Sequence, residues 1–195
     1  MEIESSIVDL QDIIINQDNL PFLDEHTEIR GTRSLRVNLD MQTQRVSDQE
    51  DCQRVINALK NAEAVEFQVG KRSTGQGKGE DWTHFLRALQ EAKSLKISIG
   101  DKTLNRGKLG QIGEELLGLG HLEKLELQFG NENNLQINGI DKVGGAIKSM
   151  RKLKELSVLI GDSCNLGSDG AKKMFQGVEE CENLEKFKLH IGKFN

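Results

Sequence analysis

A repeat with a period of 30 or 31 residues constrains this chain more than any other feature of its sequence. One aspartate and five glycines mark the period. In chain order, these marker residues are Asp40, Gly70, Gly100, Gly130, Gly161 and Gly192. Periods of this length are typical of solenoids, in which every unit packs only on its neighbours. We therefore expect a row of similar, stacked units.

Apolar residues stand five, three and one positions before each marker. The three columns are Leu35, Val65, Leu95, Leu125, Leu156 and Phe187; then Val37, Phe67, Ile97, Leu127, Val158 and Leu189; then Leu39, Val69, Ile99, Phe129, Ile160 and Ile191. A spacing of two residues is the periodicity of a β-strand that buries one face. Six strands are predicted, at residues 34–39, 64–69, 94–99, 124–129, 155–160 and 186–191.

Apolar residues at helical spacing follow the markers and place one buried face on each helix. They are Val55, Ile56 and Leu59; Trp82, Phe85, Leu86 and Leu89; Ile112, Leu116 and Leu119; Val143, Ile147 and Met150; and Met174, Phe175 and Val178. Ser47 with Glu50 has capping-box spacing, and Asn138 and Ser168 are predicted helix caps. The marker glycines are expected to permit a turn that a side chain would resist.

A strand, a helix and a second parallel strand connect through a right-handed crossover. The predicted fold class is therefore α/β, a solenoid of about six strand–helix repeats of 30–31 residues with a curved parallel sheet and outer helices. This solenoid is predicted to span residues 32–195.

The preceding residues 1–31 are predicted to form an acidic cap or docking segment. Residues 1–30 hold eight acids against Arg30 alone, so this segment carries −7 and the rest of the chain about +2. Its apolar residues have helical spacing up to Pro21, which would interrupt a helix. These residues are Ile3, Ile7, Leu10 and Ile14.

Composition limits the environment in which such a chain is expected to work. No stretch reaches the roughly 18 to 20 apolar residues of a membrane span, and acidic residues rather than cationic ones follow Met1. Cys52, Cys164 and Cys181 are odd in number and form no CxxC spacing, which indicates a reducing compartment. The nearly neutral body lacks the clustered cations that bind nucleic acid. We expect a cytoplasmic protein without membrane insertion or a nucleic-acid partner.

The segments Asn165–Phe175 and Asn183–Leu189 resemble the ribonuclease-inhibitor class of leucine-rich repeats. The resemblance covers about residues 32 to 194 and implies a scaffold that binds unrelated proteins. A glycine stands where that class usually places a strand-closing asparagine, and Asn105, Asn134 and Asn165 lie four or five residues later. The longer strand and loop resemble the expanded repeats of ciliates and other protists. This likeness implies a part in a large assembly, such as a cilium, an axoneme or the cytoskeleton.

Several groups could carry chemistry, but none has the spacing that the chemistry requires. The loop at residues 75–79 lacks the P-loop pattern, and His26, His84, His121 and His190 fall at different places in different repeats. Residues 162–169 lack the ligand spacing of an EF-hand. Lys148, Arg151, Lys152 and Lys154 are read first as complements of a helix dipole. We expect no catalytic residues, no metal and no cofactor.

Two surfaces are candidates for binding. The concave face of the sheet would present Arg36, Glu66, Lys96, Glu126, Ser157 and Lys188 in one column, and Asn38, Gln68, Ser98, Gln128, Leu159 and His190 in the other. The charges of the first column alternate and could pair with one another, so a solvated ladder and a binding face both remain open. The second surface is the end of the sheet, where an open strand edge invites a partner or a second copy. Its apolar candidates are Leu184, Phe187, Leu189, Ile191 and Phe194.

The leading hypothesis is a non-catalytic protein–protein interaction scaffold, a structural subunit of a larger complex of proteins. The alternative is a regulatory inhibitor or adaptor that binds one protein on the concave face. An enzyme is disfavoured because no nucleophile, base and orienting group can be assembled from the residues.

Overall fold

The computed structural model describes residues 12–15, 34–39, 56–57, 59–60, 62–70, 82–104 and 107–195. Every structural statement below concerns these residues. The predicted cap formed by Ser47 and Glu50 lies outside them, as do Cys52 and His26.

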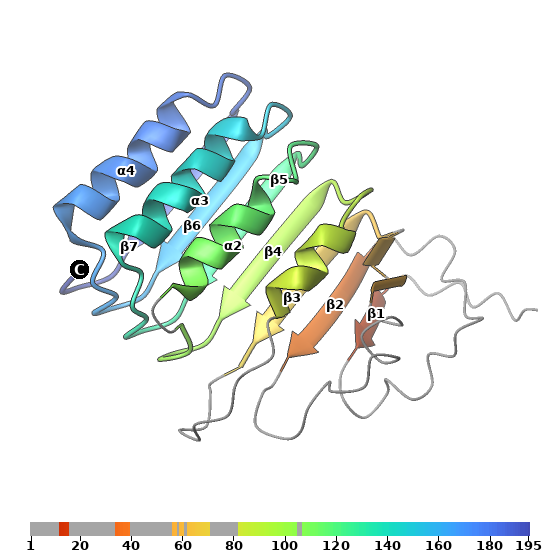
Figure 1. The fold of residues 1–195 in the computed structure, drawn as a ribbon, viewed down its shortest axis with the longest axis horizontal. Coiled ribbons are helices and arrows are strands. Elements are labelled where there is room, and N and C mark those ends of the chain that lie inside the picture. Colours follow the sequence, from red (N-terminus) through yellow and green to blue (C-terminus); the bar gives the residue numbers. More distant parts are fainter. Residues whose placement is uncertain are drawn as a thin grey trace, which may run out of the picture.

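The strands form a single parallel sheet whose spatial order follows the sequence (Figure 1). They are β1 (Asp12–Ile15), β2 (Ser34–Leu39), β3 (Ala64–Val69), β4 (Ser94–Ile99), β5 (Lys124–Phe129), β6 (Glu155–Ile160) and β7 (Lys186–Ile191). The six predicted strands are confirmed with the predicted bounds. They pair in the predicted register, with Leu95 beside Leu125 and Leu125 beside Leu156.

Strand β1 was not predicted, and it pairs with β2 at the N-terminal edge of the sheet. Ile14 therefore lies in a strand, and the helix expected for it is wrong. Pairing with a ready-made strand edge outweighs the helical spacing of isolated apolar residues. Ile3, Ile7 and Leu10 lie outside the described residues.

Helices cover one face of the sheet, and they follow one another in the same order as the strands (Figure 1). The described helices are η2 (Trp82–Ala88), α2 (Lys108–Leu116), α3 (Ile137–Ser149) and α4 (Gly167–Glu179). Residues alternate along β3 to β6 between buried and more accessible positions. The apolar columns thus face the helices, and Leu95, Leu125 and Leu127 are completely buried between the two layers.

The helices depart from the predictions in three details. The second helix is a 3-10 helix rather than an α-helix. Neither Asn138 nor Ser168 caps a helix, because α3 and α4 already begin before them and have no side-chain cap. Buried leucines at positions 135 and 166 anchor the chain to the core directly before these helices, which accounts for the early starts. Phe175, predicted to be buried, is 42% exposed.

The marker glycines have a different role from the predicted one. The backbone of Gly130, Gly161 and Gly192 is not left-handed, so no turn requires glycine there. Instead, the strand ends stack closely, and a Cβ at Gly161 would lie 2.7 Å from the carbonyl carbon of Gly130. A Cβ at Gly192 would lie 2.6 Å from that of Gly161. The period in glycine therefore records the close approach of successive units.

Candidate functional site

The face of the sheet opposite the helices carries the two predicted binding columns, and its first column is paired over the N-terminal half. The guanidinium of Arg36 lies 2.8 Å from the carboxylate of Glu66. The Lys96 ammonium lies 3.3 Å from that carboxylate and 3.8 Å from the carboxylate of Glu126. The predicted alternation of charge is thus a continuous ladder of ion pairs across β2 to β5.

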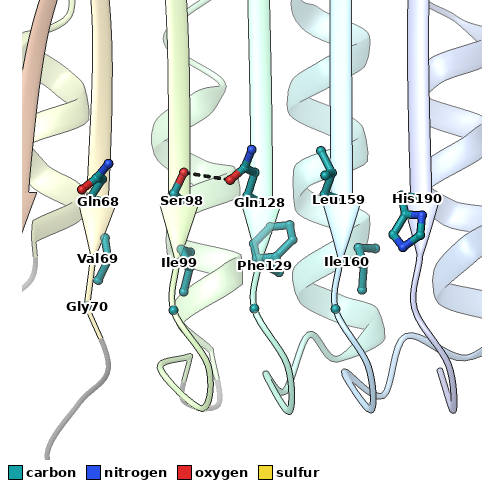
Figure 2. Close-up of a pocket in the computed structure, with 13 residues that line it drawn as sticks. Gln68, Val69, Gly70, Ser98, Ile99, Gln128, Phe129, Leu159, Ile160 and His190 are labelled. Carbon is teal, nitrogen blue, oxygen red and sulfur yellow. Dashed lines mark hydrogen bonds between the residues drawn. The ribbon is translucent and has the colours of Figure 1, made fainter.

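The second column is tied into the same network, and Figure 2 shows the hydrogen bond between its members Ser98 and Gln128. Gln68 donates a hydrogen bond to Glu66, and Gln128 donates one to Glu126. The hydroxyl of Ser98 donates to the amide oxygen of Gln128 at 3.2 Å. The side chain of Asn38 lies outside the described part. These polar groups satisfy one another, so over this half of the face the solvated-ladder interpretation fits best.

The two columns are different over β6 and β7, although Glu155 on the same face of β6 pairs with Lys124 and Lys186. Ser157 and Lys188 in the first column, and Leu159 and His190 in the second, lie on β6 and β7. Within the described residues, the polar side chains among these four have no hydrogen-bond or ion-pair partner. We call these four residues the unpaired patch. Polar groups that are not satisfied within the protein are free to bind another molecule.

A shallow depression of about 510 Å³ lies beside the unpaired patch at the ends of the strands. Gly100, Gly130 and Gly161 help to line it, as do Gln68, Ser98 and Gln128 of the paired half. Leu159 and His190 lie at one side of it (Figure 2). The patch and the depression together offer apolar surface, a hydroxyl, a cation and an imidazole.

Electrostatics on the paired half yields a pH prediction for Glu66. Burial raises the pKa of Glu66, but hydrogen bonds from Gln68, Arg36 and Lys96 outweigh it and hold the pKa below the ordinary value of 4.5. A depressed pKa stabilises the fold above the unfolded-state value, and this contribution is lost as the pH falls through the folded-state pKa. The stability advantage of the native chain over Glu66→Gln should therefore shrink below pH 4.5.

Urea unfolding of both proteins between about pH 7 and about pH 3 measures that difference. Glu63→Gln provides the matched control, because Glu63 is exposed and its closest ion-pair partner, Lys93, lies 3.4 Å away. An advantage for native Glu66 that stays constant down to the lowest pH would contradict the assigned ladder.

Sequence reasoning missed a ladder of polar side chains in the loops that follow the strands. Each member lies three residues after a marker and donates a hydrogen bond to the carbonyl of the preceding marker. The pairs are Thr103 to Gly70 at 3.1 Å, Asn133 to Gly100 at 3.0 Å, Cys164 to Gly130 at 3.2 Å and Asn195 to Gly161 at 2.8 Å. The polar column Thr43, Ser73, Thr103, Asn133, Cys164 and Asn195 could have indicated it.

The side chain of Asn133 makes four hydrogen bonds to backbone groups. Its amide oxygen accepts hydrogen bonds from the backbone N–H groups of Thr103 and Leu104, at 2.9 and 2.8 Å. Its amide nitrogen donates to Gly100 and, at 2.8 Å, to Gly130. Asn134 and Asn165, which were singled out in the sequence, are not part of the ladder, and Asn105 lies outside the described residues.

A second ladder accounts for acids that might otherwise suggest a cation site. The carboxylate of Asp101 accepts a hydrogen bond from the backbone N–H of Asn131, and the carboxylate of Asp162 accepts one from that of Lys193, each at 2.7 Å. The amide oxygen of Asn131 accepts one from Asp162 at 2.8 Å. These side chains therefore fasten one loop to the next.

The C-terminal end of the molecule exposes apolar surface where the sequence predicted an interface. Phe187, Ile191 and Phe194 are 39%, 37% and 85% exposed. Leu184 and Leu189 are partly buried against the core. Strand β7 lies at the edge of the sheet and pairs only with β6.

Groups that could support catalysis or hold a metal are not brought together in the described part of the chain. There, no group of three or more histidine, cysteine or acidic residues is placed to hold a metal ion. Burial raises the pKa of the Cys164 and Cys181 thiols, which keeps them protonated. In the basic cluster, Lys148 pairs with Glu180, and Lys154 lies 2.8 Å from Glu123. The loop at residues 75–79 lies outside the description.

Among the described helices, none is both long and apolar enough to cross a membrane. No protein-family model matches the chain, and comparison with curated proteins finds no match either.

Proposed function

We propose that this chain is a leucine-rich-repeat solenoid that acts as a non-catalytic scaffold for other proteins. Three features support the solenoid: a parallel sheet in sequence order, helices on one face, and side-chain ladders that bind each unit to the one before it. An open sheet face of this kind offers a broad, rigid surface for a protein partner. The cilium and the cytoskeleton enter the proposal through the resemblance in sequence alone.

The observation that carries the functional proposal is the division of the exposed sheet face. In the N-terminal half, the charged side chains of the first column form ion pairs with one another. The polar side chains of the unpaired patch have no such partners within the described residues. Exposed pairs such as Arg36 with Glu66 contribute little when a partner binds, because they are already satisfied and screened. We therefore assign docking to the unpaired patch and the adjoining depression. This location favours a partner held on the sheet face, as an adaptor or a scaffold subunit would hold it.

Leu159→Glu tests the assignment, since it places a charge at the centre of the patch without disturbing a hydrogen bond. We expect the chain to lose its stoichiometric partners in native purification from its source cells, with its thermal unfolding unchanged. Gln111→Glu provides the control: it adds the same charge on α2, on the opposite face of the molecule, and should retain the partners. Equal recovery of partners by the two variants would show that the patch is not the docking surface.

A further inference from the structure

The sheet and the helical layer end differently at the C-terminal side of the molecule. Strand β7 pairs with β6 on one side, and among the described strands none lies beside its other edge. A free edge presents backbone N–H and C=O groups to any added strand. The helix next to this edge is α4. The side chains on the surface of α4 that faces away from α3 determine whether a helix or only a strand can be added beside β7.

In α2 and α3, glycine lets the helix accept the next one at close range. A Cβ at Gly113 of α2 would lie 2.8 Å from the backbone of Lys142 and Val143 in α3. A Cβ at Gly144 of α3 would lie 2.9 Å from the backbone oxygen of Lys173 in α4. Side-chain carbons do not approach backbone atoms so closely, so both contacts require glycine.

Phe175 occupies the corresponding position in α4. Gly113, Gly144 and Phe175 each stand 12 residues before the first apolar residue of the following strand: Leu125, Leu156 and Phe187 respectively. A further helix packed on α4 in the same way would meet the Phe175 side chain. The ring of Phe175 instead packs edge-on against that of Phe187, with centroids 6.2 Å apart. A further helix could therefore not pack on α4 as closely as α3 packs on α2, whereas the outer edge of β7 is open within the described residues.

The charges on the exposed face indicate which side chain an added strand would place beside Lys188. Among the paired cations of the exposed face, Arg36, Lys96 and Lys124 each have a carboxylate on the strand that follows, whereas Lys186 pairs with Glu155 on the strand before it. Lys188 has Ser157 beside it on β6 and, within the described chain, no ion-pair partner. An acidic side chain on an added strand would complete the pattern, because opposite charges on neighbouring strands attract.

We propose that a lone extended segment of a partner protein adds to the free edge of β7. Its alternate apolar residues cover Phe187, Leu189 and Ile191, and a carboxylate between them faces Lys188. Strand addition of this kind combines main-chain hydrogen bonds with side-chain selection. A second copy of this chain fits less well: β7 paired with itself would bring Lys186 and Lys188 against the same lysines, and like charges on adjacent strands repel.

A peptide taken from this chain provides the probe. Residues 122–130 place Leu125, Leu127 and Phe129 on one face of a strand, with Glu126 on the other. Added to the full chain, the peptide should slow hydrogen exchange of the backbone amides in residues 186–191. Fluorescence polarisation of the labelled peptide should show two- to fivefold weaker binding for its Glu126→Lys form, the range given by about 0.4 to 1 kcal/mol for one cross-strand pair.

A charge reversal provides the decisive control. The exposed Lys188→Glu variant of the full chain should reverse this order and prefer the Glu126→Lys peptide by a similar factor. The inference is overturned if the peptide leaves residues 186–191 unprotected, if protection appears only elsewhere, or if the preference does not reverse. It is also overturned if the chain alone dimerises in sedimentation and protects β7 as its concentration rises. Because the test uses the sheet edge and a defined peptide, it can fail while docking on the sheet face stands.

Discussion

Replacing Leu125 by alanine is expected to lower the free energy of unfolding by about 2 to 5 kcal/mol. Leu125 is completely buried in β5, near the middle of the sheet. Its neighbours in the same column are Leu95 on β4 and Leu156 on β6. Removal of the side chain loses its transfer free energy and leaves a cavity that a close-packed layer of leucines fills only in part.

Denaturant unfolding followed by circular dichroism measures this effect. Leu117 provides the matched control, since it is 50% exposed just beyond α2 and its replacement by alanine should change stability by less than about 0.5 kcal/mol. Equal stabilities for the two variants would show that the apolar columns do not face the helices.

Asn133→Ala is expected to lower the free energy of unfolding by about 2 to 4 kcal/mol. Unlike Leu125→Ala, it removes hydrogen bonds rather than buried apolar surface. Asn133 is completely buried and makes four hydrogen bonds to backbone groups of its own and the preceding loop. Alanine would leave two N–H donors and two carbonyl acceptors without this partner. Unsatisfied backbone groups in a buried loop are costly because water does not replace the lost bonds fully.

The adjacent asparagine makes the comparison sharp. Asn134 has the same side chain, is only partly buried and makes no side-chain hydrogen bond within the described residues. Asn134→Ala should therefore leave the unfolding midpoint nearly unchanged. If the two variants lose stability equally, position in the ladder is not what makes Asn133 important.

The strands β2 to β7 could be predicted from the sequence to the residue, whereas β1 and the loops could not. Alternation of apolar residues, repeated six times in one register, reports directly on which side of the sheet is buried. The ladder of polar side chains in the loops was not predicted because the residue type changes along its column, from Thr103 to Asn133 to Cys164. These side chains share a hydrogen-bond donor at the same position in each repeat, and this common feature is not evident from the residue types alone.

Helix details were harder for a related physical reason. Helix starts depend on where the chain is anchored, and the buried side chain of Leu166 sets the start of α4 ahead of the predicted cap at Ser168. The exposure of Phe175 was missed because helical spacing identifies a face of the helix without saying whether anything packs on it.

The candidate surface was only partly predictable. Both columns of the exposed sheet face were identified from alternation, and the pairing of alternate charges was one of the two interpretations that the sequence left open. Within the two columns, the boundary between Glu126, where ion pairing ends, and Ser157, where the unpaired patch begins, depends on the distances between side chains on adjacent strands. Those distances follow from the register and from side-chain direction, and they required coordinates.

Site-specific photocrosslinking tests the central claim most directly. A benzophenone amino acid placed at Leu159 should, on irradiation in the source cells, form a covalent adduct with a partner protein that mass spectrometry can identify. The same probe at Gln111, exposed on the helical side, should form no comparable adduct. Adducts from position 111 with none from position 159 would contradict docking on the unpaired patch.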